Sequence, residues 1–211
     1  MHILNLKSRT TINESSLLFI ENGIRNIYIE RNSEITLHGK IKFGDNISLS
    51  GKVIILDGSI IDNGCILKNI TIGKNNSIRP YSVLENSEFG DNNIIGPFCF
   101  IRDNTKVNDG CIVGNQVELA RSILSNGVKI SHQAFMGDMV IGDNTIIGAG
   151  CISCNYSEGE RYLSKIGSYS VIGSGSLLVS PVQIGDNVVV GAGSIVLKNI
   201  SDNDKLIQKR K

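Results

Sequence analysis

The chain has 211 residues and a formal charge of +1, which gives no support for wholesale binding to nucleic acid or to an anionic membrane surface. Aromatic residues make up only 5% of the sequence, tryptophan is absent and proline is rare, whereas glycine occurs 23 times. Ordinary globular cores use aromatic side chains to fill irregular space. This composition therefore favours thin, repetitive packing of aliphatic side chains.

The N-terminal segment, residues 1–26, is predicted to be an irregular lead-in. It has neither the long apolar stretch nor the small-residue cleavage site of a signal peptide. No apolar run in the chain approaches the roughly 20 residues that a membrane-spanning helix needs. We therefore expect a soluble, cytoplasmic protein without a membrane partner.

Residues 27–198 are organised by a repeat. Between Phe43 and Val196 an apolar residue returns at almost every sixth position, with occasional steps of five. Segments such as IGDNTI, IGSGSL and VGAGSI add a glycine after that residue and a small residue four positions after it. A period of six fits neither an α-helix nor a two-sided strand. It predicts short strands and turns wound into a three-sided prism, with the apolar and the small residue both pointing inward.

One polar segment interrupts the repeat. From Ser153 to Lys165, thirteen residues pass without an apolar residue at the expected position, and the string CNY lies among them. A smooth prism has no concave surface, so a binding site on it has to be built from loops or from clefts between copies. We predict that residues 153–165 form an extruded loop beside such a site. Residues 199–211 are predicted to be a polar tail.

The six-residue pattern is similar to the hexapeptide repeat of the left-handed parallel β-helix family. The left hand is implied by this resemblance, since the general rule for parallel crossovers favours the right hand. The predicted fold class is therefore all-β, a left-handed parallel β-helix shaped as a triangular prism.

From Ile27 onward the chain resembles the C-terminal acetyltransferase half of the bacterial bifunctional N-acetylglucosamine-1-phosphate uridyltransferase/glucosamine-1-phosphate acetyltransferase family. The matching strings include IGPFCFIRDNTKV, VGNQVELARSILSNGVKISHQAFMGD and IGDNTIIGAGCISCNY, the last of which contains the interruption of the repeat. Residues 1–26 are too short for a nucleotide-binding domain, so we expect a chain without the uridyltransferase half. The resemblance implies acetyl-CoA as acyl donor and a homotrimer whose active sites lie between subunits, beneath the CNY loop.

The resemblance also implies roles for individual residues. His132 falls on the family's general base, which takes a proton from the attacking amine, and a neutral imidazole suits that role near neutral pH. The residues implied to bind the sugar acceptor are Arg102, Phe135, Asn155, Tyr156 and Arg161. Those implied to line the coenzyme site are Ser174, Ala192 and Lys209.

Three positions depart from the family's acceptor pocket. Ala120 stands where the family has a phosphate-binding lysine, Phe135 replaces a tyrosine and Ile146 replaces an asparagine. Arg121 follows Ala120, but successive strand residues point to opposite faces, so its ability to substitute stays open. Each hydrogen bond lost to a substrate costs about 1 kcal/mol, and one to a charged group about 2–3 kcal/mol.

These losses bear on the acceptor rather than on the acyl donor. We expect an N-acetyltransferase of nucleotide-sugar or cell-envelope polysaccharide biosynthesis that acts on an amino sugar, presented as a sugar phosphate or as a nucleotide sugar. Two alternatives remain. One is O-acetylation of a sugar hydroxyl with the same base. The other is a non-catalytic trimeric scaffold that has lost its acceptor site.

Five cysteines and three histidines are the candidates for metal or redox chemistry. Four cysteines stand four residues after a periodic apolar residue, in the small inward position: Cys65, Cys99, Cys111 and Cys151. The CISC string has neither a helix N-terminus nor a second ligand pair, so core packing explains it better than zinc or redox chemistry. Free thiols also fit a reducing cytoplasm.

The three histidines do not form a metal site. The γ-class zinc carbonic anhydrases use three histidines on this fold, but His2 lies outside the predicted coils and no His-x4-His spacing occurs. The sequence therefore requires no metal. His132 comes two residues after the inward-pointing Ile130, so we expect it to be exposed near a corner. A solvated surface histidine is the alternative to a catalytic one.

Overall fold

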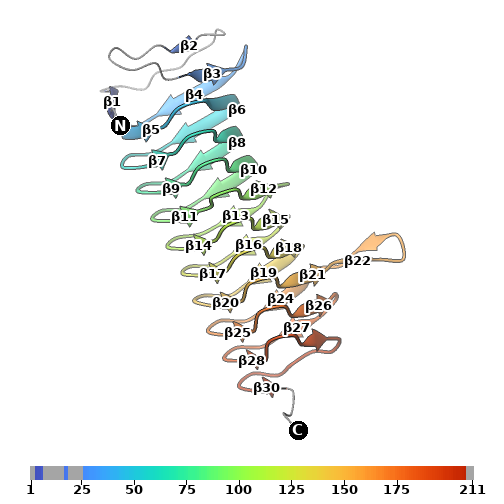
Figure 1. The fold of residues 1–211 in the computed structure, drawn as a ribbon. Helices are drawn as coiled ribbons and strands as arrows, with labels where there is room; N and C mark the ends of the chain where they lie inside the picture. The colour runs from blue at the N-terminus through green and yellow to red at the C-terminus, as the bar shows by residue number, and fades with distance from the viewer. Residues whose placement is uncertain (1–2, 7–16, 19–25, 208–211) are drawn as a thin grey trace.

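The computed structural model describes residues 3–6, 17–18 and 26–207, and these form a column of stacked coils (Figure 1). In these ranges the regular secondary structure consists of β-strands, without helices. Neighbouring coils pair in parallel, each strand with its equivalent one coil away. The predicted left-handed parallel β-helix is confirmed.

The first face of the column is a single sheet of 11 strands, of which only β1 pairs in the antiparallel sense. Its strands, in spatial order, are β1 (Ile3–Leu6), β5 (Gly39–Phe43), β7 (Ile60–Ile61), β9 (Ser77–Ile78), β11 (Ile94–Ile95), β14 (Ile112–Val113), β17 (Lys129–Ile130), β20 (Ile146–Ile147), β25 (Val171–Ile172), β28 (Val189–Val190) and β30 (Lys205–Leu206).

The second and third faces are joined in the early coils, because three long strands run across the corner between them: β6 (Ile47–Ile55), β8 (Ile66–Ile72) and β10 (Val83–Phe89). The second face also contains β2 (Leu17–Leu18), β3 (Ile27–Ile29), β12 (Phe100–Arg102), β15 (Glu118–Ala120), β18 (Phe135–Gly137), β21 (Ile152–Cys154), β26 (Leu177–Val179) and β29 (Ile195–Val196). The third face also contains β4 (Glu34–Leu37), β13 (Lys106–Val107), β16 (Ile123–Leu124), β19 (Met139–Ile141), β24 (Ser164–Ile166) and β27 (Gln183–Ile184).

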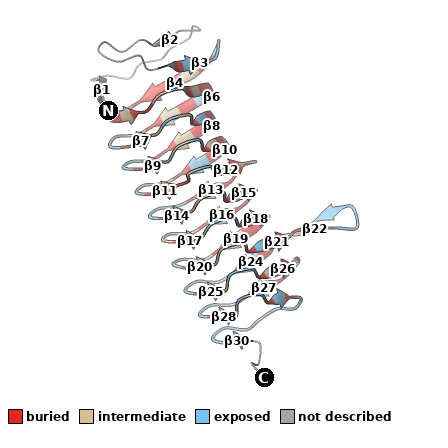
Figure 2. Ribbon diagram, viewed as in Figure 1, coloured by how far each residue is buried: buried red, intermediate tan, exposed pale blue. Residues whose placement is uncertain are grey.

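The core is the stack of periodic residues inside the column. Every aliphatic or aromatic residue of the six-residue series from Phe43 to Val196 is buried, and equivalents such as Ile95 and Val113 lie one coil apart in register. Figure 2 shows buried residues along the strands and exposed ones at many of the turns. Burying one such side chain contributes about 1.5–3 kcal/mol, so the repeat itself supplies the main stabilisation. Each coil also completes the hydrogen bonds of its neighbour.

The interruption of the repeat contains a hairpin that leaves the column. The hairpin is shorter than the predicted loop of residues 153–165, because Ser153 and Cys154 remain in strand β21 and Ser164 and Lys165 in strand β24. Its strands, β22 (Tyr156–Ser157) and β23 (Glu160–Arg161), pair only with each other, in the antiparallel sense. Figure 1 shows the hairpin projecting sideways from the stack. The amide of Tyr162 donates to the carbonyl of Asn155 at 2.9 Å, which closes the base of the hairpin.

Within these described ranges, no helix has the length and apolar character that crossing a bilayer demands.

Candidate functional site

His132 lies in the turn between the first and second faces, the His132 corner. It is exposed, and the amide of Gly150, one coil further on, donates to its carbonyl at 2.9 Å. Its ring lies against the preceding coil, since a Cβ added to Gly114 would be 3.2 Å from Nδ1 of His132. The sequence-based expectation of an exposed histidine near a corner is therefore met.

The same two corner positions recur in successive coils, linked by amide-to-carbonyl hydrogen bonds. The first positions are Asn63, Pro80, Pro97, Asn115, His132, Ala149, Ser174 and Ala192, and the second are Gly64, Tyr81, Phe98, Gln116, Gln133, Gly150, Gly175 and Gly193. Ser174 and Ala192, which the sequence assigned to the coenzyme site, thus stand in line with His132. All three occupy one edge of the column.

The His132 corner changes character at His132. Before it, the rings of Tyr81 and Phe98 stack with their centroids 5.5 Å apart and their planes 8° from parallel. After it, a Cβ added to Gly150 or Gly175 would meet no atom of the surrounding structure within 4 Å. The corner is therefore filled by aromatic side chains in early coils and open beyond His132.

A cluster of ion pairs occupies the opposite edge of the second face, at the Arg121 corner. Arg121 donates through Nε and Nη2 to the two carboxylate oxygens of Asp138, at 2.7 and 3.0 Å, and through Nη1 to Oδ2 of Asp103 at 2.8 Å. Arg102 donates through Nη1 to the same Oδ2 and through Nη2 to Glu118 at 2.7 Å. Two guanidinium groups thus share one carboxylate oxygen.

The structure shows where the side chain of Arg121 points, which the alternation of strand residues did not determine. Arg121 follows the last residue of β15 and has a φ of 53°, so it belongs to the turn rather than to the strand. The alternation of faces therefore does not apply to it, and its guanidinium reaches the same carboxylate as Arg102. Ala120 itself is fully buried.

The hydrogen bonds of the cluster favour the charged forms of Asp138, Arg102 and Arg121. Burial by itself raises the pKa of Asp138, but hydrogen bonds from Arg121 and Asn155 outweigh it and hold the pKa below the ordinary 3.8. Hydrogen bonds to Glu118 and Asp138 raise the pKa values of Arg102 and Arg121, respectively. The Arg121 corner is therefore a permanently charged surface.

Between the two corners, β18 carries the less polar part of the second face. The ring of Phe135 lies over Gly137, because a Cβ added to Gly137 would be 2.7 Å from Cζ of Phe135 and 2.6 Å from Nδ2 of Asn155. Asn155 also donates to Asp138, which fixes its amide against the ion-pair cluster. Phe135, Asn155 and the two arginines therefore border one surface.

The other residues singled out in the sequence lie on the hairpin, on the first face or outside the described residues. Tyr156 and Arg161 pair across the hairpin and are exposed, and the charge of Arg161 helps to lower the pKa of Asp138. Ile146 lies on β20 of the first face, on the other side of the His132 corner from Phe135. Lys209 lies outside the described residues.

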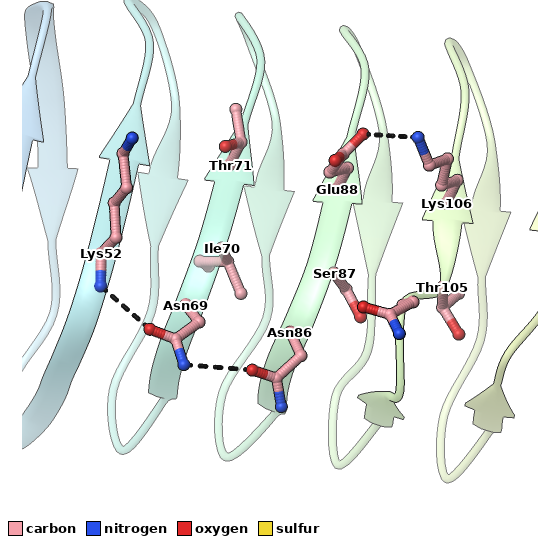
Figure 3. A pocket seen from close by; sticks show the side chains of 10 residues that line it. Lys52, Asn69, Ile70, Thr71, Asn86, Ser87, Glu88, Thr105 and Lys106 are labelled. Atoms are coloured by element: carbon pink, nitrogen blue, oxygen red, sulfur yellow. Dashed lines mark hydrogen bonds and ion pairs between the residues drawn. The ribbon is translucent and has the colours of Figure 1, made fainter.

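A polar groove of about 320 Å³ runs along the early coils (Figure 3). Its floor is an amide ladder, in which Asn69 accepts from the backbone of Lys52 at 3.0 Å and donates to Asn86 at 3.1 Å. Lys106 and Glu88 pair across its upper edge at 3.1 Å. None of the predicted site residues lines this groove, so we locate the candidate site on the second face instead.

Neither a metal nor a reactive thiol stands out in this site. Within the described ranges, no group of three or more histidine, cysteine, aspartate or glutamate side chains could hold a metal ion. The four cysteines predicted to point inward are buried, which confirms that prediction. Burial raises the pKa of Cys65, Cys99 and Cys111 to about 11, so these thiols are poor nucleophiles at neutral pH.

Sequence reasoning missed several residues of the site. Asp103, Glu118 and Asp138 hold the arginines, and Asn115 precedes His132 by one coil at the same corner position. The Oδ1 atom of Asn115 is buried and has no hydrogen-bond partner among the described residues. Asn115 lies at the position equivalent to His132 in the preceding coil, so the period of the repeat could have pointed to it. No sequence pattern pointed to Asp103.

The sequence and the fold of this chain are similar to those of known transferases. Residues 86–121 and 164–198 match the family described as bacterial transferase hexapeptide (six repeats). Among solved structures, LpxA from Acinetobacter baumannii is similar with a TM-score of 0.59 and 17% identity, covering 79% of this chain and 64% of that one. The Arabidopsis UDP-N-acetylglucosamine acyltransferase gives 0.54 and 16%, covering 82% of this chain and 67% of that one. The chain is thus similar to hexapeptide-repeat transferases over part of its length, and it shares the left-handed β-helix fold of these solved structures.

Within that class, the chain is similar to proteins named bifunctional protein GlmU. The one from Wigglesworthia glossinidia brevipalpis is 42% identical over 173 residues, and the one from Baumannia cicadellinicola subsp. Homalodisca coagulata is 37% identical over 180 residues. Each match covers 82% of this chain and 38% of the relative. The chain thus spans less than half of the length of these relatives.

Proposed function

We propose that this chain is an acyltransferase that moves an acetyl group from acetyl-CoA to the nitrogen of an amino sugar. The acceptor is an amino sugar held as a sugar phosphate or a nucleotide sugar, and His132 is the general base. Similarity to the GlmU proteins and the hexapeptide transferase match support an acyltransferase with a coenzyme A thioester as donor. Ser174 and Ala192 are proposed to line the coenzyme site, and Arg102, Phe135, Asn155, Tyr156 and Arg161 to contact the acceptor.

One observation carries this proposal. His132 stands where the His132 corner changes from filled to open, at one edge of the face whose other edge holds Arg102 and Arg121. A thioester arm lying along the open corner and a sugar lying on the second face would meet at His132. The reacting groups would then be held close together, which supplies much of the rate of an acyl transfer.

The chemistry needs only one proton acceptor. The amine nitrogen adds to the thioester carbonyl carbon and His132 takes a proton from that nitrogen. The C–S bond then breaks, and the leaving thiolate receives this proton from His132 and departs as the coenzyme thiol. The Nδ1 atom of His132 faces the preceding coil. The other nitrogen, Nε2, is then free to accept the proton.

We also propose that the active unit is a homotrimer with its sites between subunits. In one chain, Phe135 and Ile146 lie on different faces, separated by the His132 corner. Both can border one acceptor only if a second copy supplies one of them. A molecular mass measured by light scattering tests this: a monomer in solution at working concentration contradicts it.

The test of function is release of coenzyme A thiol from acetyl-CoA in the presence of a panel of amino sugars and their phosphates. His132→Ala is expected to lower kcat by about 10²–10⁴-fold, the usual contribution of a general base. The melting temperature and the oligomeric mass should stay unchanged, because His132 is exposed. Turnover that survives in the variant contradicts the proposed role of His132.

A non-catalytic scaffold is the second candidate, and the changed acceptor residues Ala120, Phe135 and Ile146 favour it. Thermal stabilisation by ligands separates the two. Stabilisation by acetyl-CoA without stabilisation by any sugar in the panel indicates an enzyme with a different acceptor, and O-acetylation of a sugar hydroxyl is then tested next. Stabilisation by neither ligand supports the scaffold.

A further inference from the structure

Asp103 occupies the point on which two guanidinium groups converge. Arg102 and Arg121 each donate through Nη1 to the same oxygen, Oδ2 of Asp103, the second at 2.8 Å. Proteins use convergent arginines of this kind to bind an anionic group of a ligand. Here the chain itself supplies the anion, from the residue that directly follows Arg102.

Each of the two arginines also binds a second carboxylate. Arg102 also pairs with Glu118 at 2.7 Å, and Arg121 holds Asp138 with two hydrogen bonds. Three carboxylates thus hold the two guanidinium groups at this corner, and the positive charge of Arg161 on the hairpin also acts on Asp138. The neighbouring position 120 on the same strand is an alanine, so it adds no positive charge.

A phosphate monoester, with nearly two negative charges, therefore meets two guanidinium groups that carboxylates of the chain already neutralise. The side chains of Arg102 and Arg121 are 29% and 28% exposed, so charges at this corner are only partly screened by water. The lowered pKa of Asp138 means that its carboxylate stays charged when a ligand arrives. Repulsion from Asp103, Glu118 and Asp138 disfavours a dianion but is weaker for a singly charged or neutral group.

We infer that Asp103 is an internal anion that selects against phosphate monoesters, so that the acceptor is an amino sugar in glycosidic or phosphodiester linkage. This inference rests on the proposed function and narrows its substrate class. The N–H groups of Arg102 and Arg121 that have no carboxylate partner remain able to donate to a glycosidic or a diester oxygen. Each phosphate group in a diester linkage, including those of a nucleotide sugar, carries one charge, whereas the phosphate group of a monoester carries nearly two, and this local difference is what Asp103 detects.

The experiment compares acceptors in the wild type and in Asp103→Asn, which keeps the shape of the side chain and removes its charge. The acceptors are glucosamine-1-phosphate, methyl glucosaminide and UDP-glucosamine, each with acetyl-CoA. For the wild type, kcat/KM for glucosamine-1-phosphate should not exceed that for the other two. In Asp103→Asn, the ratio of glucosamine-1-phosphate to methyl glucosaminide should rise by about tenfold, as expected for removing one like charge at this range.

Two control variants make the result specific. Asp103→Glu keeps the charge and should keep the wild-type ratio. Glu88→Gln also removes a carboxylate from an ion pair, with Lys106, but lies on the third face outside the cluster and should leave the ratio unchanged. A wild type that prefers glucosamine-1-phosphate by more than tenfold overturns the inference, and so does an Asp103→Asn variant whose ratio does not rise.

Binding of inorganic phosphate gives a measurement that does not depend on activity. Calorimetry should show binding to Asp103→Asn that is at least several-fold tighter than to the wild type. If no amino sugar is acetylated but phosphate binds as described, the proposed function fails while the internal anion stands. If turnover is observed but neither phosphate binding nor acceptor preference changes, the inference fails alone.

Discussion

The early and late coils share one backbone but present opposite surfaces at the His132 corner. Phe98 and Gly175 occupy equivalent positions with φ values of 57° and 71°. In the early coils that position holds stacked rings, whereas in the late coils it is open. The open edge proposed to hold the coenzyme therefore has small residues where the early coils have rings, on an unchanged frame, and His132 stands at the boundary.

The Arg121 corner makes a parallel transition. In the early coils it carries the neutral amides of Asn69 and Asn86, which bond to each other at 3.1 Å. Further along it carries Arg121 and Asp138, which form a two-bond ion pair. The charged corner begins at Asp103, in the same coil as Phe98, and extends to Asp138 in the coil that holds Phe135. Position along the column, rather than a change of fold, thus separates the structural region from the candidate site.

The largest effect is expected from giving the late corner a large side chain. Ala192→Trp would fill the open edge beside Gly175 and Gly193 and should raise KM for acetyl-CoA by about tenfold or more, a loss of roughly 1.4 kcal/mol in binding. Ala192 is exposed, so the melting temperature should change little. Steady-state kinetics check this, and an unchanged KM would remove the corner from the coenzyme site.

The converse substitution, Phe98→Ala, makes the early corner resemble the late one. Loss of the stacked pair should lower the free energy of unfolding by about 1 kcal/mol. Denaturant unfolding measures that change, with Ile112→Ala, which removes an exposed side chain from the first face, as the matched control. KM for acetyl-CoA should stay at the wild-type value, so a clear rise would mean that the early corner also contacts the coenzyme.

The smallest effect concerns the charged corner, where Asp138→Asn restores the neutral chemistry of the early coils. The pKa of Asp138 is lower in the folded state than its ordinary 3.8. Its stabilising contribution is therefore fully present above pH 3.8 and is lost as the pH falls through the lowered value. The difference in unfolding free energy between wild type and variant should shrink below pH 3.8. A difference that stays constant or grows would show that the ion pair with Arg121 does not set this pKa.

The inward half of this structure was predictable because one physical demand repeats in every coil. Ile101, Leu119 and Met136 must stack on one another, so an aliphatic or sulfur-containing side chain is required at each step. The small inward position made the burial of Cys99 and Cys111 predictable in the same way. His132 could be placed by counting two residues from Ile130.

The Arg121 corner was less predictable because residues in turns do not alternate between two faces as strand residues do. The direction of Arg121 depends on its positive φ, which arginine rarely adopts and which no local pattern announced. Asp103 looked like an ordinary polar turn residue, and only the stacking of coils 18 residues apart brings it to Arg121. The acceptor surface therefore depended on three-dimensional register that the six-residue pattern does not encode.

The hairpin of β22 and β23 enters and leaves the column without disturbing the coils on either side. Equivalent residues are usually 17 apart, but across the hairpin they are 25 apart, and Cys154 still pairs with Val179 and Met139 with Ser164. Insertions of different length at this point are therefore compatible with the same column. The part of the molecule next to the acceptor surface is free to diverge while the stability of the protein stays intact, so new substrate preferences can evolve on an old frame.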